Sequence, residues 1–239
     1  CGFVFHGPSD GLFSGDGSRI VVADLAPGGS VRTLKVPGAF TSLALSPDGR
    51  WLVTSFWKGN GTRVWNVETG QLDRLLEDEG GMTAFSPDGS RLVVGTAREF
   101  VLYDTSDWTR VRRIERDAAS ALSGLVAFSP NGEFLALTPA LRQVRLVSAS
   151  DWEELATLEG PVPDRINALS FSPDSRRLAA ATDNGAVQVW DLPVLRQELA
   201  ALSLDWAGEL RPDTAPSSVA AAASRTGFPD DVSSVETWT

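Results

Sequence analysis

Few side chains in this sequence could carry catalysis. His6 is the sole histidine and Cys1 the sole cysteine, so a Ser-His-Asp or Cys-His arrangement has at most one candidate base. His6 stands at a strand-to-turn junction, where an exposed turn residue is the simpler interpretation. Cys1 as an N-terminal nucleophile lacks an identifiable base and oxyanion donors. We therefore expect no catalytic residue and no intrinsic hydrolase, kinase or transferase activity.

Metal and phosphate chemistry also lacks its usual residues. The segments Lys58-Gly59-Asn60-Gly61 and Asp183-Asn184-Gly185 carry oxygen ligands but are too short and too sparsely charged for a calcium loop. Ala26-Pro27-Gly28-Gly29 is not followed by a helix that could present its N-terminus to a phosphate. One cysteine excludes an internal disulfide and a Cys-based zinc cluster. These segments predict tight turns, with no metal and no cofactor.

The charge balance argues against nucleic acid as a partner. The formal net charge is -10, and the only lysines are Lys35 and Lys58. Phosphate binding needs clustered cations, whose association releases counterions. The densest cationic stretch is interrupted by Val111, Ile114 and Glu115, which favours one solvated face of a strand over a phosphate site; its members are Arg110, Arg112, Arg113 and Arg116.

The compartment is constrained only loosely. No apolar run approaches the ~20 residues of a transmembrane helix, and no signal segment precedes the first repeat. Cys1 stands where an initiator Met would, which fits the edge of a piece of a longer chain, the lipid-carrying residue of a bacterial lipoprotein, or a nucleophile. We expect a cytoplasmic protein, with a periplasmic location or a lipid anchor at Cys1 as alternatives.

A turn phrase recurs along the chain. Measured at its fourth position, the steps are 38 (11 to 49), 40 (49 to 89), 43 (89 to 132) and 43 (132 to 175), and a period near 40 is typical of propellers. Pro fixes φ, Asp or Asn bonds its own backbone, and Gly tolerates positive φ. The phrases are Pro8-Ser9-Asp10-Gly11, Ser46-Pro47-Asp48-Gly49, Ser86-Pro87-Asp88-Gly89, Ser129-Pro130-Asn131-Gly132 and Ser172-Pro173-Asp174-Ser175.

Each repeat predicts four antiparallel strands. A short apolar strand such as Leu43 to Leu45 precedes the turn, and a nearly continuous apolar strand such as Arg91 to Gly95 follows it. A third strand follows, as in Phe100 to Asp104, and a fourth alternates, as in Val111 to Ile114. In the first repeat Asp16-Gly17 joins strands two and three, because the other register leaves no room for a third strand. Five blades are expected, at about 2–40, 41–80, 81–122, 123–165 and 166–192.

The third strands carry a family resemblance. Val64-Trp65-Asn66-Val67 and Val189-Trp190-Asp191-Leu192 resemble the Trp-Asp ending of WD40 repeats, and the likeness covers roughly residues 2 to 206. It implies an all-β, WD40-type β-propeller. The Gly-His pair that often opens such repeats is absent, and Tyr103-Asp104 and Val147-Ser148 replace Trp-Asp in two blades. The family's buried His-Ser/Thr-Asp-Trp network is therefore expected to be incomplete, so the blades should depend on apolar packing.

The repeat pattern ends in a helix. Asp191 or Leu192 is the expected cap and Pro193 the first-turn proline of a closing helix over 193–206, with Leu195, Leu199, Leu202 and Trp206 on one face. The last blade then has no fourth strand, although family rings commonly close with an N-terminal strand. We expect an incomplete ring that lacks N-terminal blades. Residues 207–239 have few apolar anchors and are expected to be disordered.

The resemblance implies a binding module, not an enzyme. The phrase from Leu195-Arg196 to Leu204-Asp205-Trp206 resembles the end of WD40 arrays in large bacterial multidomain proteins, where a kinase or signalling domain often precedes them. We expect a non-catalytic protein-protein interaction scaffold in such a protein, with protein partners. A TolB-like or peptidase-accessory propeller in the periplasm is the alternative. The candidate contacts lie in loops between strands two and three: Trp57, Lys58, Arg98, Arg142 and Asp183.

The remaining tryptophans are expected to pack. Trp51, Trp65 and Trp190 lie in strands, as core or inter-blade residues. Trp108 and Trp152 follow an Asp at the same point of two consecutive repeats, which favours packing at the blade rim over binding.

Overall fold

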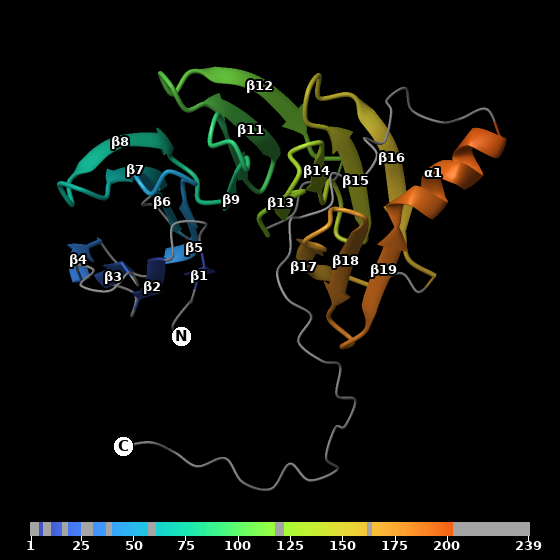
Figure 1. Cartoon of the computed structure of the whole chain (residues 1–239), viewed down its shortest axis with the longest axis horizontal. Helices are drawn as coiled ribbons and strands as arrows, with labels where there is room; N and C mark the ends of the chain where they lie inside the picture. Colours follow the sequence, from blue (N-terminus) through green and yellow to red (C-terminus); the bar gives the residue numbers. More distant parts are fainter. Residues whose placement is uncertain are drawn as a thin grey trace, which may run out of the picture. The chain divides into compact units, whose positions relative to one another are not determined.

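The computed structural model describes residues 5–6, 11–15, 19–24, 31–36, 40–56, 61–117, 122–161 and 164–202. Nineteen strands and one helix lie in these ranges, and the strands form five antiparallel sheets in chain order (Figure 1). The first sheet consists of β1 (Phe5–His6), β2 (Gly11–Gly15), β3 (Arg19–Asp24) and β4 (Val31–Lys35). The second consists of β5 (Phe40–Leu45), β6 (Trp51–Phe56), β7 (Thr62–Asn66) and β8 (Leu72–Glu77).

The next three sheets follow the same order. The third consists of β9 (Met82–Phe85), β10 (Arg91–Gly95), β11 (Glu99–Asp104) and β12 (Arg110–Glu115). The fourth consists of β13 (Val126–Phe128), β14 (Phe134–Leu137), β15 (Gln143–Ser148) and β16 (Glu154–Glu159). The fifth has β17 (Ile166–Phe171), β18 (Arg177–Thr182) and β19 (Val187–Asp191). These five sheets are called blades 1 to 5, and they confirm the propeller expected from the repeats.

Successive blades meet through their first strands. β5 contacts β9, β9 contacts β13, and β13 contacts β17, so the first strands are the innermost ones. In blades 2 to 4 the second and third strands are largely buried on both faces. Leu92, Val93 and Val94 of β10, and Leu135 of β14, are fully inaccessible. Blade 5 differs, because Val187 and Val189 of its third strand are 64% and 57% exposed. Hydrophobic clusters join neighbouring blades. One of them contains Val53 and other residues of blade 2 together with residues of β10 and β11 of blade 3. The near-continuous apolar runs of these strands follow from this two-sided burial.

The fourth strands are more exposed than their alternating pattern predicts. Leu72 and Leu75 of β8 are 46% and 51% exposed, and Val111 of β12 is 46% exposed. The pairing of the third and fourth strands shifts register between Val64 and Trp65, between Leu102 and Tyr103, and at the same point of blade 4. Such a bulge changes which side chains face inward, so simple alternation fails along the outer strand.

The helix α1 (Leu192–Ala201) is shorter than expected. Asp191 is its N-cap, one of the two caps expected from the sequence, and the Asp191 side chain accepts a hydrogen bond from the Val194 amide at 3.2 Å. Leu192 is buried against blade 5 and Leu195 packs beside it. The helix ends at Ala201, and Leu202 is 69% exposed, so the expectation of a helix over 193–206 with Leu202 on the packed face was wrong. Leu202 is the C-cap, and its backbone has left the helical conformation.

Several other sequence expectations lie outside the described residues. These are the positions of Cys1, Trp57, Lys58 and Trp206, and the disorder of residues 207–239. His6 is the last residue of β1 and pairs with Leu12 in the register of β1 and β2, so it lies at the end of the first strand, as expected.

Candidate interaction surface

The antiparallel order of the strands gives each blade two loop-bearing ends. The turns between strands two and three and the connections between blades lie at one end, called face A. The Ser-Pro-Asp-Gly turns and the turns between strands three and four lie at the other, called face B. Adjacent antiparallel strands run in opposite directions, so their connections must alternate between the two ends.

Face A carries the predicted contact residues that the structure describes. Arg98 follows β10, with its side chain 79% exposed and its Nε 3.9 Å from a Glu79 carboxylate oxygen. Arg142, in the loop before β15, is also exposed. Asp183 follows β18, and its carboxylate is 2.7 Å from Arg165 Nε. Because these pairs are solvent-exposed, they contribute little stability and leave the charges accessible to a partner.

A pocket of about 240 Å³, called the hub pocket, opens among the innermost strands on face A. Thr41 and Ile166 come from β5 and β17, and Leu141 comes from a loop between strands two and three. Its lining is largely apolar, with two arginines; besides those three residues it includes Met82, Leu125, Thr138, Arg116 and Arg165.

Arg116 departs from the sequence expectation. It was assigned to a solvated strand face with Arg110, Arg112 and Arg113, but β12 ends at Glu115 and Arg116 is only 8% exposed. Its Nη1 donates to the carbonyl oxygens of Thr96 at 3.3 Å, Ala97 at 2.9 Å and Leu122 at 2.7 Å. Burial lowers the pKa of its guanidinium below the ordinary value. Ile114, two residues earlier, packs against a core cluster. Residues two apart lie on the same side of a strand, so this spacing was the sequence signal for the burial of Arg116.

The other three arginines of the stretch lie at the surface as predicted. Arg110 Nε is 3.3 Å from a Glu77 carboxylate oxygen, and Arg113 Nη1 is 3.4 Å from one of Glu99. Arg112 Nη1 donates to the carbonyl oxygen of Asp151 in the next blade at 3.4 Å. Each of the three therefore makes a polar contact within the chain.

The turns of face B owe their shape to the repeated phrase. In blade 2, the Gly49 amide donates to the Ser46 carbonyl oxygen at 2.8 Å, and Gly49 has a φ of 72°. The Ser46 hydroxyl accepts from the Trp51 amide at 2.8 Å and donates to the Asp48 carboxylate at 2.5 Å. Asp48 also accepts from the Arg50 amide at 3.0 Å. Pro47 and these hydrogen bonds account for the recurrence of the phrase.

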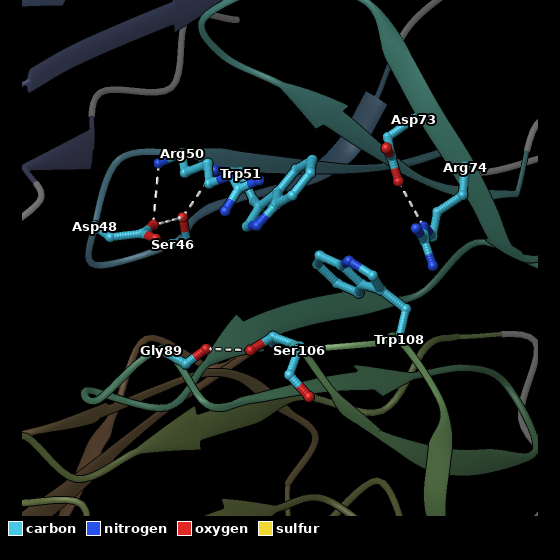
Figure 2. A pocket seen from close by; sticks show the side chains of 10 residues that line it. Ser46, Asp48, Arg50, Trp51, Asp73, Arg74, Gly89, Ser106 and Trp108 are labelled. Carbon is cyan, nitrogen blue, oxygen red and sulfur yellow. Dashed lines mark hydrogen bonds and ion pairs between the residues drawn. The ribbon is translucent and has the colours of Figure 1, made fainter.

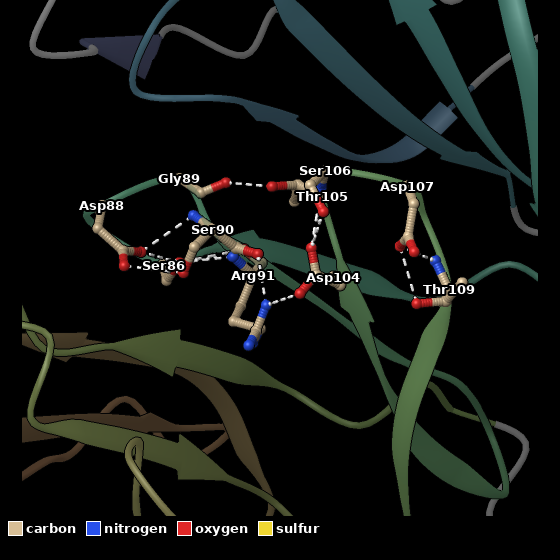
Figure 3. A network of polar contacts seen from close by, with 10 residues as sticks. All are labelled: Ser86, Asp88, Gly89, Ser90, Arg91, Asp104, Thr105, Ser106, Asp107 and Thr109. Atoms are coloured by element: carbon tan, nitrogen blue, oxygen red, sulfur yellow. Dashed lines mark hydrogen bonds and ion pairs between the residues drawn. The ribbon is translucent and has the colours of Figure 1, made fainter.

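Blade 3 repeats this arrangement and extends it (Figure 3). Asp88 accepts hydrogen bonds from the hydroxyls of Ser86 and Ser90, and the Ser86 bond is the main reason that its pKa lies below the ordinary value. Arg91 pairs with Asp104, which ends the third strand. Hydrogen bonds from Ser106 hold the pKa of Asp104 low. The Asp of the Tyr103-Asp104 ending therefore organises the turn that follows the third strand.

A second pocket, of about 430 Å³, lies on face B where blade 2 meets blade 3 (Figure 2). The rings of Trp51 and Trp108 meet edge to face there, with centroids 5.7 Å apart. The guanidinium of Arg50 lies 4.8 Å from the Trp51 ring centroid, and that of Arg74 lies 5.7 Å from the Trp108 ring centroid. Trp108 is 7% exposed and belongs to a core cluster, so the expectation that it packs is confirmed. Two arginines of the chain itself, Arg50 and Arg74, thus already make cation–π contacts with these indole rings.

A polar contact joins blade 3 to blade 2. The Tyr103 hydroxyl donates to the Glu77 carboxylate of blade 2 and accepts from Arg110 Nε at 3.2 Å. Burial and the Glu77 carboxylate raise the pKa of Tyr103 well above its usual range. In blade 2, Trp65 Nε1 donates to the Thr54 hydroxyl at 2.8 Å, inside the core. Blade packing is thus mainly apolar, with isolated buried hydrogen bonds.

No cluster of three or more His, Cys, Asp or Glu side chains is placed to hold a metal ion among the described residues. No helix among the described residues is long and apolar enough to span a membrane.

Comparison with known proteins identifies the repeats. The family model "WD domain, G-beta repeat" matches residues 28–66 and 152–191. The chain is 30% identical over 138 residues to the WD repeat-containing protein SL1-17 of Schistosoma mansoni, across 56% of this chain and 45% of that protein. It is 30% identical over 109 residues to periodic tryptophan protein 2 of Saccharomyces cerevisiae, across 45% of this chain and 12% of that protein. This chain therefore spans less than half the length of these relatives.

A solved structure shares the fold. The Kuenenia stuttgartiensis hydrazine synthase superimposes with a TM-score of 0.62 at 17% identity, covering 75% of this chain and 54% of that one. At this identity the likeness concerns the arrangement of strands and carries no argument about activity.

Proposed function

We propose that this chain, which belongs to the WD40-repeat β-propeller family, is a non-catalytic module that binds protein partners through face A. The observation that carries the proposal is the hub pocket on the same face as exposed, charged loop side chains. Loops on a rigid β-scaffold are where binding residues concentrate, because they can vary without disturbing the strands. Arg98, Arg142 and Asp183 are the proposed contacts, and we extend the proposal to Trp57 and Lys58, which follow β6 in the sequence.

The proposal includes a regulatory role in a larger bacterial signalling protein. The resemblance of the segment from Leu195 to Trp206 to the end of such arrays supports it. A periplasmic, TolB-like role is the competing proposal. The Trp65-Asn66 and Trp190-Asp191 endings of the third strands favour the first.

A charge-reversal comparison tests the use of face A. The variant Arg98→Glu/Arg142→Glu changes two exposed side chains of face A, and the control Arg50→Glu/Arg176→Glu makes the same charge change on face B. Cross-linking and mass spectrometry of wild-type and variant chains, expressed in the native host, would identify bound proteins. We expect partners that are lost from the face A variant and kept by the control. Partners kept by both variants, or lost only from the control, would contradict the proposal.

A further inference from the structure

Arg116 carries a buried charge without a carboxylate partner among the described residues. Two nearby carboxylates form ion pairs with other arginines: an oxygen of Asp117 is 2.7 Å from Arg145 Nη2, and an oxygen of Glu99 is 3.4 Å from Arg113 Nη1. Three carbonyl oxygens accept from Arg116 Nη1, whereas its buried Nε has no hydrogen-bond acceptor among the residues that the structure describes. Residues 118–121, Ala-Ala-Ser-Ala, contain no carboxylate. A buried cation is ordinarily paired, because desolvation is costly unless an opposite charge compensates for it.

The surroundings of Arg116 match an acidic side chain with an apolar stem. Arg116 lines the hub pocket with Met82, Leu125, Leu141 and Ile166. The second arginine of the pocket differs, because Arg165 donates from Nη2 to Asp183 at 3.0 Å and has its Nε 2.7 Å from the same carboxylate. Arg116 is therefore the cation of this pocket that still lacks a carboxylate among the described residues.

The size of the pocket indicates what kind of molecule enters it. Sites for small organic ligands usually enclose about 300–1,000 Å³. The hub pocket, at about 240 Å³, is smaller. It suits one side chain of an extended peptide that continues over the loops of face A.

We propose that the hub pocket binds a Glu or Asp side chain, flanked by apolar residues, from an extended segment of a protein partner. The carboxylate pairs with Arg116, and the apolar flanks contact Met82, Leu125 and Ile166. This proposal rests on the proposed function and specifies the chemistry of the partner.

Met82 offers a direct reporter, since it is the only methionine of the chain and lines the pocket. The full chain, labelled with methyl-¹³C methionine, would be titrated with end-blocked nine-residue peptides that carry a central Glu between Leu, Ile or Val residues. The same peptides with a central Gln are the controls. We expect saturable movement of the Met82 methyl resonance with Glu peptides and at least tenfold weaker binding of Gln peptides. Equal affinity for both sets, or no movement with any Glu peptide, would overturn the proposal.

Variants separate charge recognition from a loss of folding. Arg116→Gln should abolish the preference for Glu, but this residue is buried and its replacement could unfold the blade. Leu141 is 39% exposed at the pocket, so Leu141→Asp and Leu141→Lys should both fold. We expect Leu141→Asp to weaken Glu-peptide binding at least tenfold, Leu141→Lys to keep it, and Arg165→Gln to keep the preference for Glu. Equal affinity of Leu141→Asp and Leu141→Lys for the Glu peptides would contradict the proposal.

The two proposals can fail separately. Partners that depend on Arg98 and Arg142 but bind the Leu141→Asp chain normally would leave face A as the interaction surface and overturn the role of the hub pocket. Loss of those partners from both Leu141→Asp and the Arg98/Arg142 variant supports both.

Discussion

The Tyr103→Phe substitution removes the hydroxyl that joins blade 3 to the Glu77 carboxylate of blade 2. Tyr103 is 1% exposed, and phenylalanine fits the same space, so the change removes a hydrogen bond without leaving a large cavity. A hydrogen bond to a charged group contributes about 1.5–3 kcal/mol. Glu77 keeps its contact with Arg110 at 3.3 Å, so the loss of unfolding free energy should be about 2 kcal/mol.

The pH dependence of that loss has a definite sign. The folded pKa of Tyr103 lies above the ordinary value of 10.0, so the contribution of the hydroxyl is fully present below about pH 10 and is lost as the pH rises toward the folded pKa. The advantage of wild type over Tyr103→Phe should be constant between about pH 7 and 9. It should then fall by up to about 1.4 kcal/mol per pH unit above pH 10.

Urea unfolding of both proteins, followed by tryptophan fluorescence and compared at equal m-values, measures these differences. A double-mutant cycle with Glu77→Gln isolates the pair. A loss under about 0.5 kcal/mol, strictly additive single changes, or an advantage that grows above pH 10 would refute the assignment of this hydrogen bond as a stabilising contact between blades.

Three further outcomes are expected. Ser175 has a φ of 60° where other repeats have glycine, and its hydroxyl accepts a hydrogen bond from a backbone amide of blade 4 at 3.0 Å. Both Ser175→Ala and Ser175→Gly lose that hydrogen bond, but only Gly relieves the backbone strain. Ser175→Ala should therefore be about 1 kcal/mol less stable than Ser175→Gly in urea unfolding. Ser86→Ala should raise the pKa of Asp88 toward its ordinary value, which carboxyl ¹³C titration measures. A carboxyl whose folded pKa is lowered stabilises the fold above about pH 4, and this stabilisation is lost as the pH falls. The variant should therefore lose less stability in acid than the wild type. Leu192→Ala should cost about 2–4 kcal/mol, whereas Leu202→Ala, at a site 69% exposed, should change thermal unfolding little.

Much of the fold was predictable because its determinants are local. The Pro, Asp and Gly of each turn phrase act through their own backbone and their nearest neighbours, so Ser46 to Gly49 identified a turn without tertiary information. The expected strand Arg91 to Gly95 matches β10 residue for residue. Two-sided burial imposes a continuous apolar run that can be identified in a single sequence.

The candidate site was predictable only in part. The loops bearing Arg98, Arg142 and Asp183 followed from the strand order, since a turn between strands two and three must lie at a fixed end of the blade. Arg116 was misassigned because its burial depends on where β12 ends and on carbonyl groups from the loop after β10, some twenty residues away. The end of α1 at Ala201 depended on packing in the same way, because Leu202 has the right spacing but no surface to cover.

The sequence by itself determined the repeat, its four-stranded unit, the turn chemistry and a helix cap at Asp191 or Leu192, because each depends on residues only a few positions apart. Only the tertiary structure decided which side chains of different blades come together. Tyr103 meets Glu77 across a blade boundary, and the hub pocket gathers Thr41, Arg116 and Ile166 from three blades. These contacts depend on the packing of successive sheets, and on bulges that change which side chains face inward, which no periodicity along a single strand records.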